Sequence, residues 1–171
     1  VQHSGTISAQ TTWSVDDVHQ VTGDVTVNAG VILTIEPGAV VKFNANAGLT
    51  INGALYAVGT LVEPIVFTSY RDDEVAGDTN GDGPSQGLAG DWDGINFLST
   101  TTVSQTRLER ATVRYGGRAT ANVYVDTAAV AIVDCELRDS FRTGAYFYNS
   151  AGTIEGTLIE DSVDQGIYVY Y

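Results

Sequence analysis

The sequence lacks several features that common protein classes require. Its 171 residues include a single cysteine, Cys135, and no methionine. One cysteine cannot form a disulfide within the chain, and Cys135 lies between Asp134 and Glu136 in an alternating segment, which indicates a small core residue. Because even the first residue is not methionine, we expect a processed or trimmed chain.

Positive charge is also scarce. The chain has 8 basic residues against 21 acidic ones, a formal net charge of -13 at pH 7. This balance repels nucleic-acid phosphates and anionic membrane surfaces, so we expect no nucleic-acid partner and regard divalent cations as the natural ones. No apolar run approaches the roughly 18 residues of a membrane helix, and no charged-then-apolar leader opens the sequence, so we expect no membrane insertion and no signal peptide.

Helical periodicity is missing as well, and strand-like runs take its place. Runs rich in Val, Ile, Tyr and Thr recur with Gly and Asn between them, and no stretch of a dozen residues keeps a helical period. The hydrophobic content of 43% is enough for one continuous core. The sequence therefore predicts a single all-β domain over residues 1–171.

A repeat of about two dozen residues indicates the fold. Residues 132–147 align with residues 154–169 at a constant offset of 22, without a gap. Three short strands per repeat, each with alternate side chains inward, stack into a coil with three faces and one apolar column per face. The three columns are Val27, Ile51, Phe97, Val125, Phe147 and Val169; Ile35, Ala57, Leu108, Ile132 and Ile154; and Phe43, Phe67, Val113, Leu137 and Ile159.

These columns predict a right-handed, single-stranded parallel β-helix, a solenoid of about five to six coils. The handedness follows from the strong preference of connections between parallel strands. The coils are assigned to residues 25–69 and 94–171, and residues 1–24 are expected to form an N-terminal cap over the first rung. At the other end the sequence stops inside a strand at Tyr171, so we expect either a truncated chain or another molecule that covers the last rung.

Three motifs resemble a known family. They lie at residues 25–43, 64–69 and 90–97. Their order resembles that in secreted and cell-surface proteins of bacteria and archaea built from right-handed parallel β-helix repeats. The likeness covers most of the chain, and it implies an extracellular module, secreted or attached to the cell surface, that is often part of a much longer protein.

One inserted acidic loop, at residues 70–93, explains the long steps in all three columns. Within it Asp78, Asn80 and Asp82 occupy alternate positions and Gly83 follows, a spacing that wraps a hard cation. This run resembles the first half of an EF-hand loop and the calcium loops of dockerins and thrombospondin type-3 repeats.

Position twelve of this motif is Ala89 instead of glutamate, so other residues must complete the coordination. The carboxylates near enough in sequence are Asp72, Asp73, Asp91 and Asp93. The sequence predicts a Ca2+ ion that orders the loop. A solvated acidic loop that matches the motif by chance is the alternative.

Tyrosines recur at the same offset on the outer surface. Tyr124, Tyr146 and Tyr168 neighbour inward positions of the first column, so we expect them to stack as a ladder with a spacing of about 4.8 Å. Tyr148 and Tyr170 form a second pair. The strip either stabilises the sheet or binds a ligand, for which sugar rings and a neighbouring subunit are the two candidates.

Catalysis is the minority interpretation. Many parallel β-helix proteins are polysaccharide lyases or hydrolases. Here, however, the acidic cluster lies in a peripheral loop, and both histidines lie in the expected cap. No serine, cysteine or zinc constellation has the required context.

We therefore expect a non-catalytic extracellular β-helix module that serves as a structural, adhesive or self-assembling surface element and is stabilised by calcium. Self-association would use the open C-terminal rung or the tyrosine ladder. The alternative is a polysaccharide-binding or polysaccharide-degrading module.

Overall fold

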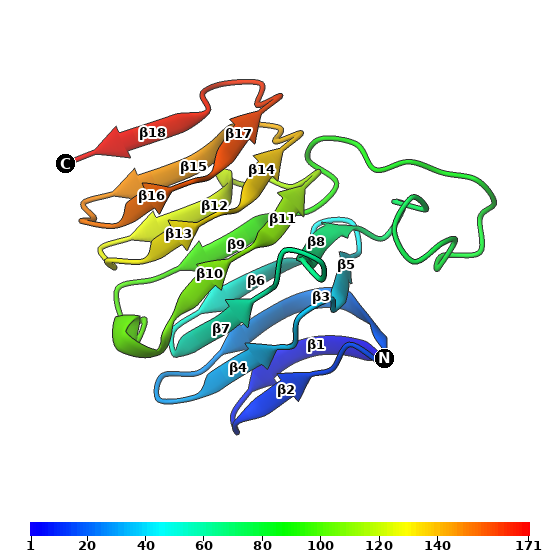
Figure 1. Cartoon of the computed structure of the whole chain (residues 1–171), viewed down its shortest axis with the longest axis horizontal. Coiled ribbons are helices and arrows are strands. Elements are labelled where there is room, and N and C mark those ends of the chain that lie inside the picture. The colour runs from blue at the N-terminus through cyan, green and yellow to red at the C-terminus, as the bar shows by residue number, and fades with distance from the viewer.

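The computed structural model describes all residues from Val1 to Tyr171 and forms a parallel β-helix (Figure 1). Its eighteen strands pair in parallel, and the only helical element is a short 3-10 turn, Val103–Gln105. No helix is long and apolar enough to cross a membrane. The colours of Figure 1 change gradually from one end of the stack to the other, because each coil pairs with its neighbours in sequence. The all-β solenoid predicted from the sequence is confirmed.

The first face carries the first apolar column, and the predicted register is confirmed. Val27 pairs with Ile51, Ile51 with Phe97, and the series continues through Val125 and Phe147 to Val169. The strands are β1 (Gln2–Ile7), the second part of β3 (Val18–Val27), β6 (Gly48–Ile51), β9 (Gly94–Phe97), β12 (Ala121–Asp126), β15 (Thr143–Tyr148) and β18 (Ile167–Tyr170).

The second face is a six-stranded sheet that carries the second column. Ile35 pairs with Ala57, Ala57 with Leu108, and Leu108 with Ile132, which pairs with Ile154, as predicted. The strands are β2 (Thr11–Trp13), β4 (Ile32–Ile35), β7 (Ala54–Val58), β10 (Arg107–Glu109), β13 (Ala131–Val133) and β16 (Thr153–Glu155).

The third face is joined to the first in one twelve-stranded sheet, because β3 is continuous over both. Its column runs from Phe67 through Val113 and Leu137 to Ile159. The strands are the first parts of β1 and β3, β5 (Val40–Phe43), β8 (Ile65–Ser69), β11 (Ala111–Arg114), β14 (Glu136–Arg138) and β17 (Leu158–Glu160).

The start of the third column was wrong by two residues. Phe67 pairs with Val41, whereas Phe43 pairs with Ser69. Both Val41 and Phe43 are buried, so the alternation of strand side chains does not distinguish the two registers. The small Ser69 leaves space beside Phe43, and Trp92 stacks on the Phe43 ring there, with centroids 3.9 Å apart and an interplanar angle of 9°.

The N-terminal segment also differs from the expectation. Residues 1–24 form a further regular coil, in which β1 and β2 pair in parallel with β3 and β4. Trp13 continues the second column above Ile35 and is buried. The stack consequently has six complete coils, one for each strand of the second face, and β18 opens a seventh.

The core is one cluster of 33 buried residues that extends from Trp13 to Phe147. Each fully buried Val, Leu, Ile or Phe contributes about 1.5–3 kcal/mol to folding, so the columns supply most of the stabilisation. The last coil is less enclosed: Val169 keeps its place in the first column but is 45% exposed.

The long loop leaves the coil after β8 and returns at β9, the bounds predicted from the sequence. In Figure 1 it is the green segment that protrudes from the corner near β8 and β11. The corresponding connections from the third face to the first are short elsewhere, such as residues 44–47 between β5 and β6. The candidate site therefore lies beside a rigid sheet and not on a flexible terminus.

Candidate functional site

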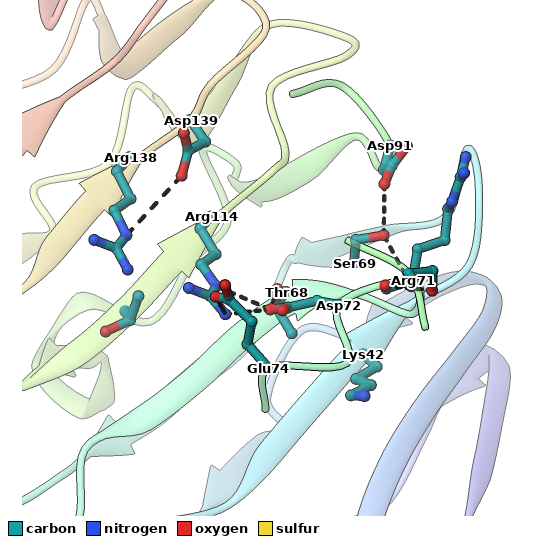
Figure 2. Close-up of polar contacts among 12 residues, drawn as sticks. Lys42, Thr68, Ser69, Arg71, Asp72, Glu74, Asp91, Arg114, Arg138 and Asp139 are labelled. Atoms are coloured by element: carbon teal, nitrogen blue, oxygen red, sulfur yellow. Dashed lines mark hydrogen bonds and ion pairs between the residues drawn. The ribbon is translucent and has the colours of Figure 1, made fainter. Parts of the chain in front are cut away.

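The base of the inserted loop is fixed by a buried ion pair. The Oδ2 atom of Asp72 accepts hydrogen bonds from Nε and Nη2 of Arg114 at 2.9 and 2.6 Å, and from Oγ1 of Thr68 at 2.5 Å (Figure 2). Asp72 is fully buried, and Arg114 is 5% exposed. Glu74 adds a weaker contact, with its Oε2 atom 3.3 Å from Arg114 Nη2. We call Asp72, Arg114, Thr68 and Lys42 the loop clamp.

Lys42 is the second cation of the clamp. It is fully buried, and its Nζ atom donates a hydrogen bond to the carbonyl of Gly77 at 2.7 Å. Burial lowers the pKa of Lys42, although the nearby carboxylates of Asp72, Asp73 and Asp78 act to raise it. The clamp exists because Lys42, Thr68 and Arg114 point outward from the third face, at consecutive strands under the loop.

Three carboxylates meet at the tip of the loop. Oxygen atoms of Asp73, Asp78 and Asp82 all lie within 4.8 Å of one another. Asn80 belongs to the same turn, and its Oδ1 atom accepts a hydrogen bond from the amide of Asp82 at 3.2 Å. We call these four residues the acidic tip. None of its three carboxylates forms an ion pair with a basic side chain.

Backbone amides hold Asp78 in place. Its Oδ1 atom accepts from the amide of Gly81 at 2.6 Å, and its Oδ2 atom accepts from the amide of Gly83 at 3.1 Å. These hydrogen bonds, with that from Gly81 the largest cause, lower the pKa of Asp78. Gly81 and Gly83 have φ values of 73° and 85°, a region that favours glycine, so the turn depends on both.

Asp73 carries an oxygen without a protein partner. Its Oδ2 atom accepts from the amide and the hydroxyl of Ser85, at 2.7 and 3.2 Å, while its Oδ1 atom is buried and makes no hydrogen bond. Buried polar atoms in native proteins are nearly always paired. The geometry of the acidic tip therefore fits a bound cation.

The structure does not bring all seven predicted ligands together. Asp72 belongs to the clamp. Asp91 Oδ2 accepts from the hydroxyl of Ser69 and the amide of Leu88, at 2.7 and 2.9 Å, which fixes the return of the loop (Figure 2). Asp93 Oδ1 is 2.7 Å from Nε of Arg118. Of the predicted ligands, Asp73, Asp78 and Asp82 bring their carboxylate oxygens within 4.8 Å of one another, and Asn80 belongs to the same turn.

The tyrosine ladder forms on the outer side of the first face as the register predicts. Ring centroids are 5.2 Å apart for Tyr124 and Tyr146 and 4.8 Å apart for Tyr146 and Tyr168, and both pairs meet edge to face at 67°. Tyr148 and Tyr170 lie parallel, with centroids 5.5 Å apart and an angle of 6°. These edge-to-face and parallel arrangements are both favourable for aromatic pairs.

A groove of about 200 Å3 runs beside this ladder. Tyr146 and Tyr168 are among the residues that line it, and Arg142, Asp164 and Gln165 supply charged and amide groups. Sequence reasoning missed these three polar residues. The available signal was that Arg142 and Asp164 are separated by the same offset of 22 as the tyrosines, and thus share a corner of successive coils.

The remaining reactive side chains, Cys135, His3 and His19, are buried or half-buried. Cys135 is buried, and burial raises its pKa to about 11, so the thiol is protonated at neutral pH. His3 and His19 point into the first coil, where they stack on each other with ring centroids 5.1 Å apart. The predicted core position of Cys135 is confirmed.

Comparisons with known proteins bear on the fold. Neither the curated proteins nor the solved structures include a match to this chain. The sequence model of one family, described as a pectate-lyase like beta helix domain, matches residues 5–124, more than two thirds of the chain. The chain therefore belongs to the family of pectate-lyase-like β-helix domains.

Proposed function

We propose that the chain is a non-catalytic structural module of a secreted or cell-surface protein, in which Ca2+ bound at the acidic tip orders the inserted loop. The observation that carries this proposal is the convergence of Asp73, Asp78 and Asp82 within 4.8 Å without a basic partner. Three ionised carboxylates this close repel one another, and a divalent cation reverses the sign of that interaction. The rigid coil then serves as a spacer, an adhesive element or a self-assembling unit.

The donor set favours calcium over softer metals. Carboxylate, amide and carbonyl oxygens suit hard cations, and no thiol or imidazole lies at the tip. Asp78, Asn80 and Asp82 follow the one-three-five spacing, and Gly83 supplies the sharp turn at position six. The Oδ1 atom of Asp73, which has no protein partner, would provide a ligand from the start of the loop, and backbone carbonyls and water would complete the shell.

The position of the general-base candidates supports a structural role. Lys42 is buried and bonded to Gly77, and the two imidazoles lie inside the first coil. A lyase needs a basic group beside its metal-bound substrate, and an inverting hydrolase needs two free carboxyls about 6.5–9.5 Å apart. The acidic tip offers a compact cation site instead.

Calcium titration with a matched pair of variants tests this proposal. At a free calcium concentration about 100 times Kd, binding stabilises the fold by about 2.7 kcal/mol and raises Tm. The Asp78→Asn/Asp82→Asn variant should lose this response and remain protease-sensitive at residues 76–84. The Asp16→Asn/Glu155→Gln variant changes the net charge equally, at exposed positions away from the loop, and should respond as the unmodified chain does.

The control separates a specific site from general charge screening. Equal calcium responses in all three proteins would contradict the proposal, as would an unchanged Tm and cleavage pattern with and without chelator. Magnesium should act more weakly than calcium, because it requires a stricter octahedral geometry and dehydrates reluctantly.

A glycan-binding or glycan-cleaving module is the second candidate function. The groove favours it, because aromatic rings of Tyr146 and Tyr168 lie beside Arg142 and Asp164, and sugars combine an apolar face with hydroxyl groups. The family description, pectate-lyase like, agrees with a polysaccharide ligand.

Binding and depolymerisation assays with neutral and acidic polysaccharides test this candidate. Tyr146→Ala should abolish either activity, while Tyr56→Ala, an exposed tyrosine on the second face, should leave it unchanged. Absence of binding across the panel, or equal binding by both variants, would count against a glycan ligand.

Self-assembly would use the tyrosine ladder. Tyr148, Tyr168 and Tyr170 are exposed on the outer side of β15 and β18. An exposed aromatic patch of this kind is typical of protein–protein contact surfaces. Sedimentation velocity over a range of concentrations should show association that Tyr170→Lys reduces. A constant monomer would rule out this mode of assembly.

A further inference from the structure

Three inward-facing rings stack on one another in the first coil. His3, Trp13 and His19 come from β1, β2 and β3, one from each strand of the first coil. His3 stacks on Trp13 with centroids 4.3 Å apart, and Trp13 stacks on His19 at 5.3 Å. His19 pairs with Val41 and His3 with Val21, so two titratable groups occupy columns that are otherwise mostly apolar.

The hydrogen bonds of the two imidazoles assign their protons. His19 Nε2 lies 2.8 Å from the carbonyl of Ser14, which can only accept, so this nitrogen carries a hydrogen. In the neutral ring the Nδ1 atom of His19 is then an acceptor, and His3 Nε2, 2.9 Å away, donates to it. A pair of neutral rings satisfies both contacts, and the tautomer of each ring is then determined by its neighbour.

Protonation of both imidazoles is incompatible with this arrangement. When one ring gains a proton, a change of tautomer in the other keeps the shared hydrogen bond, but two imidazoliums place N–H donors against each other across 2.9 Å, inside a layer where His19 is 3% exposed. Burial lowers the pKa of both residues, and that of His3 falls to about 4. The other charged groups nearby are the Val1 amine, which disfavours the imidazolium, and Asp17, which favours it at His19.

We infer that the stack of His3, Trp13 and His19 is an acid-sensitive contact of the first coil, which holds β1 against β3 at neutral pH and lets it detach when the imidazoles are protonated. β1 is suited to local opening because its register against β3 shifts between His3 and Gly5. Detachment would expose the edge of β3, which is a surface for strand pairing. The coils from β4 onward contain no histidine and would remain folded.

The direction of the pH effect follows from linkage. A histidine whose pKa is lower in the folded state than its unfolded value of about 6.5 stabilises the neutral folded form. This stabilisation is complete above about pH 6.5 and is lost as the pH falls toward about 4. Between pH 7 and pH 5 the ratio of open to closed first coil should rise on the order of tenfold.

Histidine-selective NMR labelling of the unmodified chain provides the direct test, because the sequence contains two histidines and each gives one resolved titration. Both should titrate below 6.5, with His3 near 4. Over pH 7 to 5, amide protection in residues 2–7 should decrease about tenfold after correction for the intrinsic exchange rate. Protection in β6, β9 and β12 should not change. Titration of either imidazole at or above 6.5, or constant protection of β1, would overturn the inference.

A variant pair adds a second readout. His3→Gln keeps an N–H donor for His19 but does not titrate, so the pH dependence of β1 protection should shrink at least threefold. Val15→Ala alters an exposed residue of the neighbouring connection and should retain the full dependence. Equal pH dependence in the two variants would also contradict the inference.

Discussion

Aspartates at the base and at the tip of the inserted loop have different partners. In the loop clamp, Asp72 lies against Arg114 and Thr68, which the sheet provides from two neighbouring strands. In the acidic tip, Asp73, Asp78 and Asp82 face one another, and none of them forms an ion pair with a basic side chain. Asp72 and Asp73 are consecutive, so the chain separates the two environments within one residue.

This difference shows which carboxylates are paired with a cationic side chain of the protein and which are not. A buried carboxylate that lacks a cation is strongly destabilising, so Asp72 depends on Arg114 at every calcium concentration. The carboxylates at the tip have solvent nearby and can remain charged, but they gain free energy from a bound divalent ion. We therefore expect calcium-independent anchoring at the base and calcium-dependent order at the tip.

The largest expected effect is at the base. Asp72→Asn removes the charge that Arg114 requires and should lower the free energy of unfolding by about 3–5 kcal/mol, with or without calcium. Urea unfolding in chelator and in saturating calcium measures both values. Glu74→Gln removes the exposed partner of the same arginine and should cost less than about 1 kcal/mol. If calcium fully restored the free energy of unfolding of Asp72→Asn, the base of the loop would depend on calcium as the tip does, and the prediction would be wrong.

An intermediate effect is expected where the two regions meet. Lys42 holds Gly77 and lies near Asp73 and Asp78, so its charge opposes a second cation at the tip. Lys42→Met keeps an apolar stem of similar length and should tighten calcium binding about fivefold, close to 1 kcal/mol. Isothermal titration calorimetry checks this value. As a control, Arg118→Gln, which removes the partner of Asp93, should change Kd less than twofold. Weaker calcium binding by Lys42→Met would contradict the prediction and show that Lys42 orders the acidic tip.

The smallest effect is expected away from the loop. Tyr148 and Tyr170 stack in parallel on the outer face, and each ring is partly solvated. Tyr148→Ala and Tyr170→Ala should each cost less than about 1 kcal/mol, with a coupling energy of about 0.5–1 kcal/mol in a double-mutant cycle. Thermal unfolding in chelator gives these values. A decrease in the free energy of unfolding as large as that of Asp72→Asn would mean that these outer tyrosines stabilise the fold as strongly as buried residues do.

The fold could be predicted from the sequence because every coil of a solenoid needs the same pattern of inward apolar and outward polar or aromatic residues. The offset of 22 places Val125, Phe147 and Val169 in one column, and the same offset aligns Tyr146 with Tyr168 on the outside. Pairing in parallel coils turns a one-dimensional period directly into contacts. The prediction was wrong at Phe43 because inward residues two positions apart satisfy the same pattern, and wrong at residues 1–24 because a first coil built on His3 and His19 has few aliphatic positions.

The site was only partly accessible. The spacing of Asp78, Asn80 and Asp82 is local, so the turn they form could be predicted from the motif. The separation of Asp72 from Asp73 depends on Arg114, 42 residues further along the chain. Nothing in the local sequence indicates which of two adjacent carboxylates turns toward the sheet.

The sequence by itself determined the architecture, the position of the insertion and the outward tyrosine ladder, because each follows from a period that side-chain alternation imposes on every coil. Only the tertiary structure decided which carboxylates pair with cationic side chains and how Trp92 fills the space beside Phe43. It also decided that the imidazoles of His3 and His19 meet inside the first coil. These outcomes depend on side chains from different coils that approach within a few ångströms, and such distances arise only when the chain is wound.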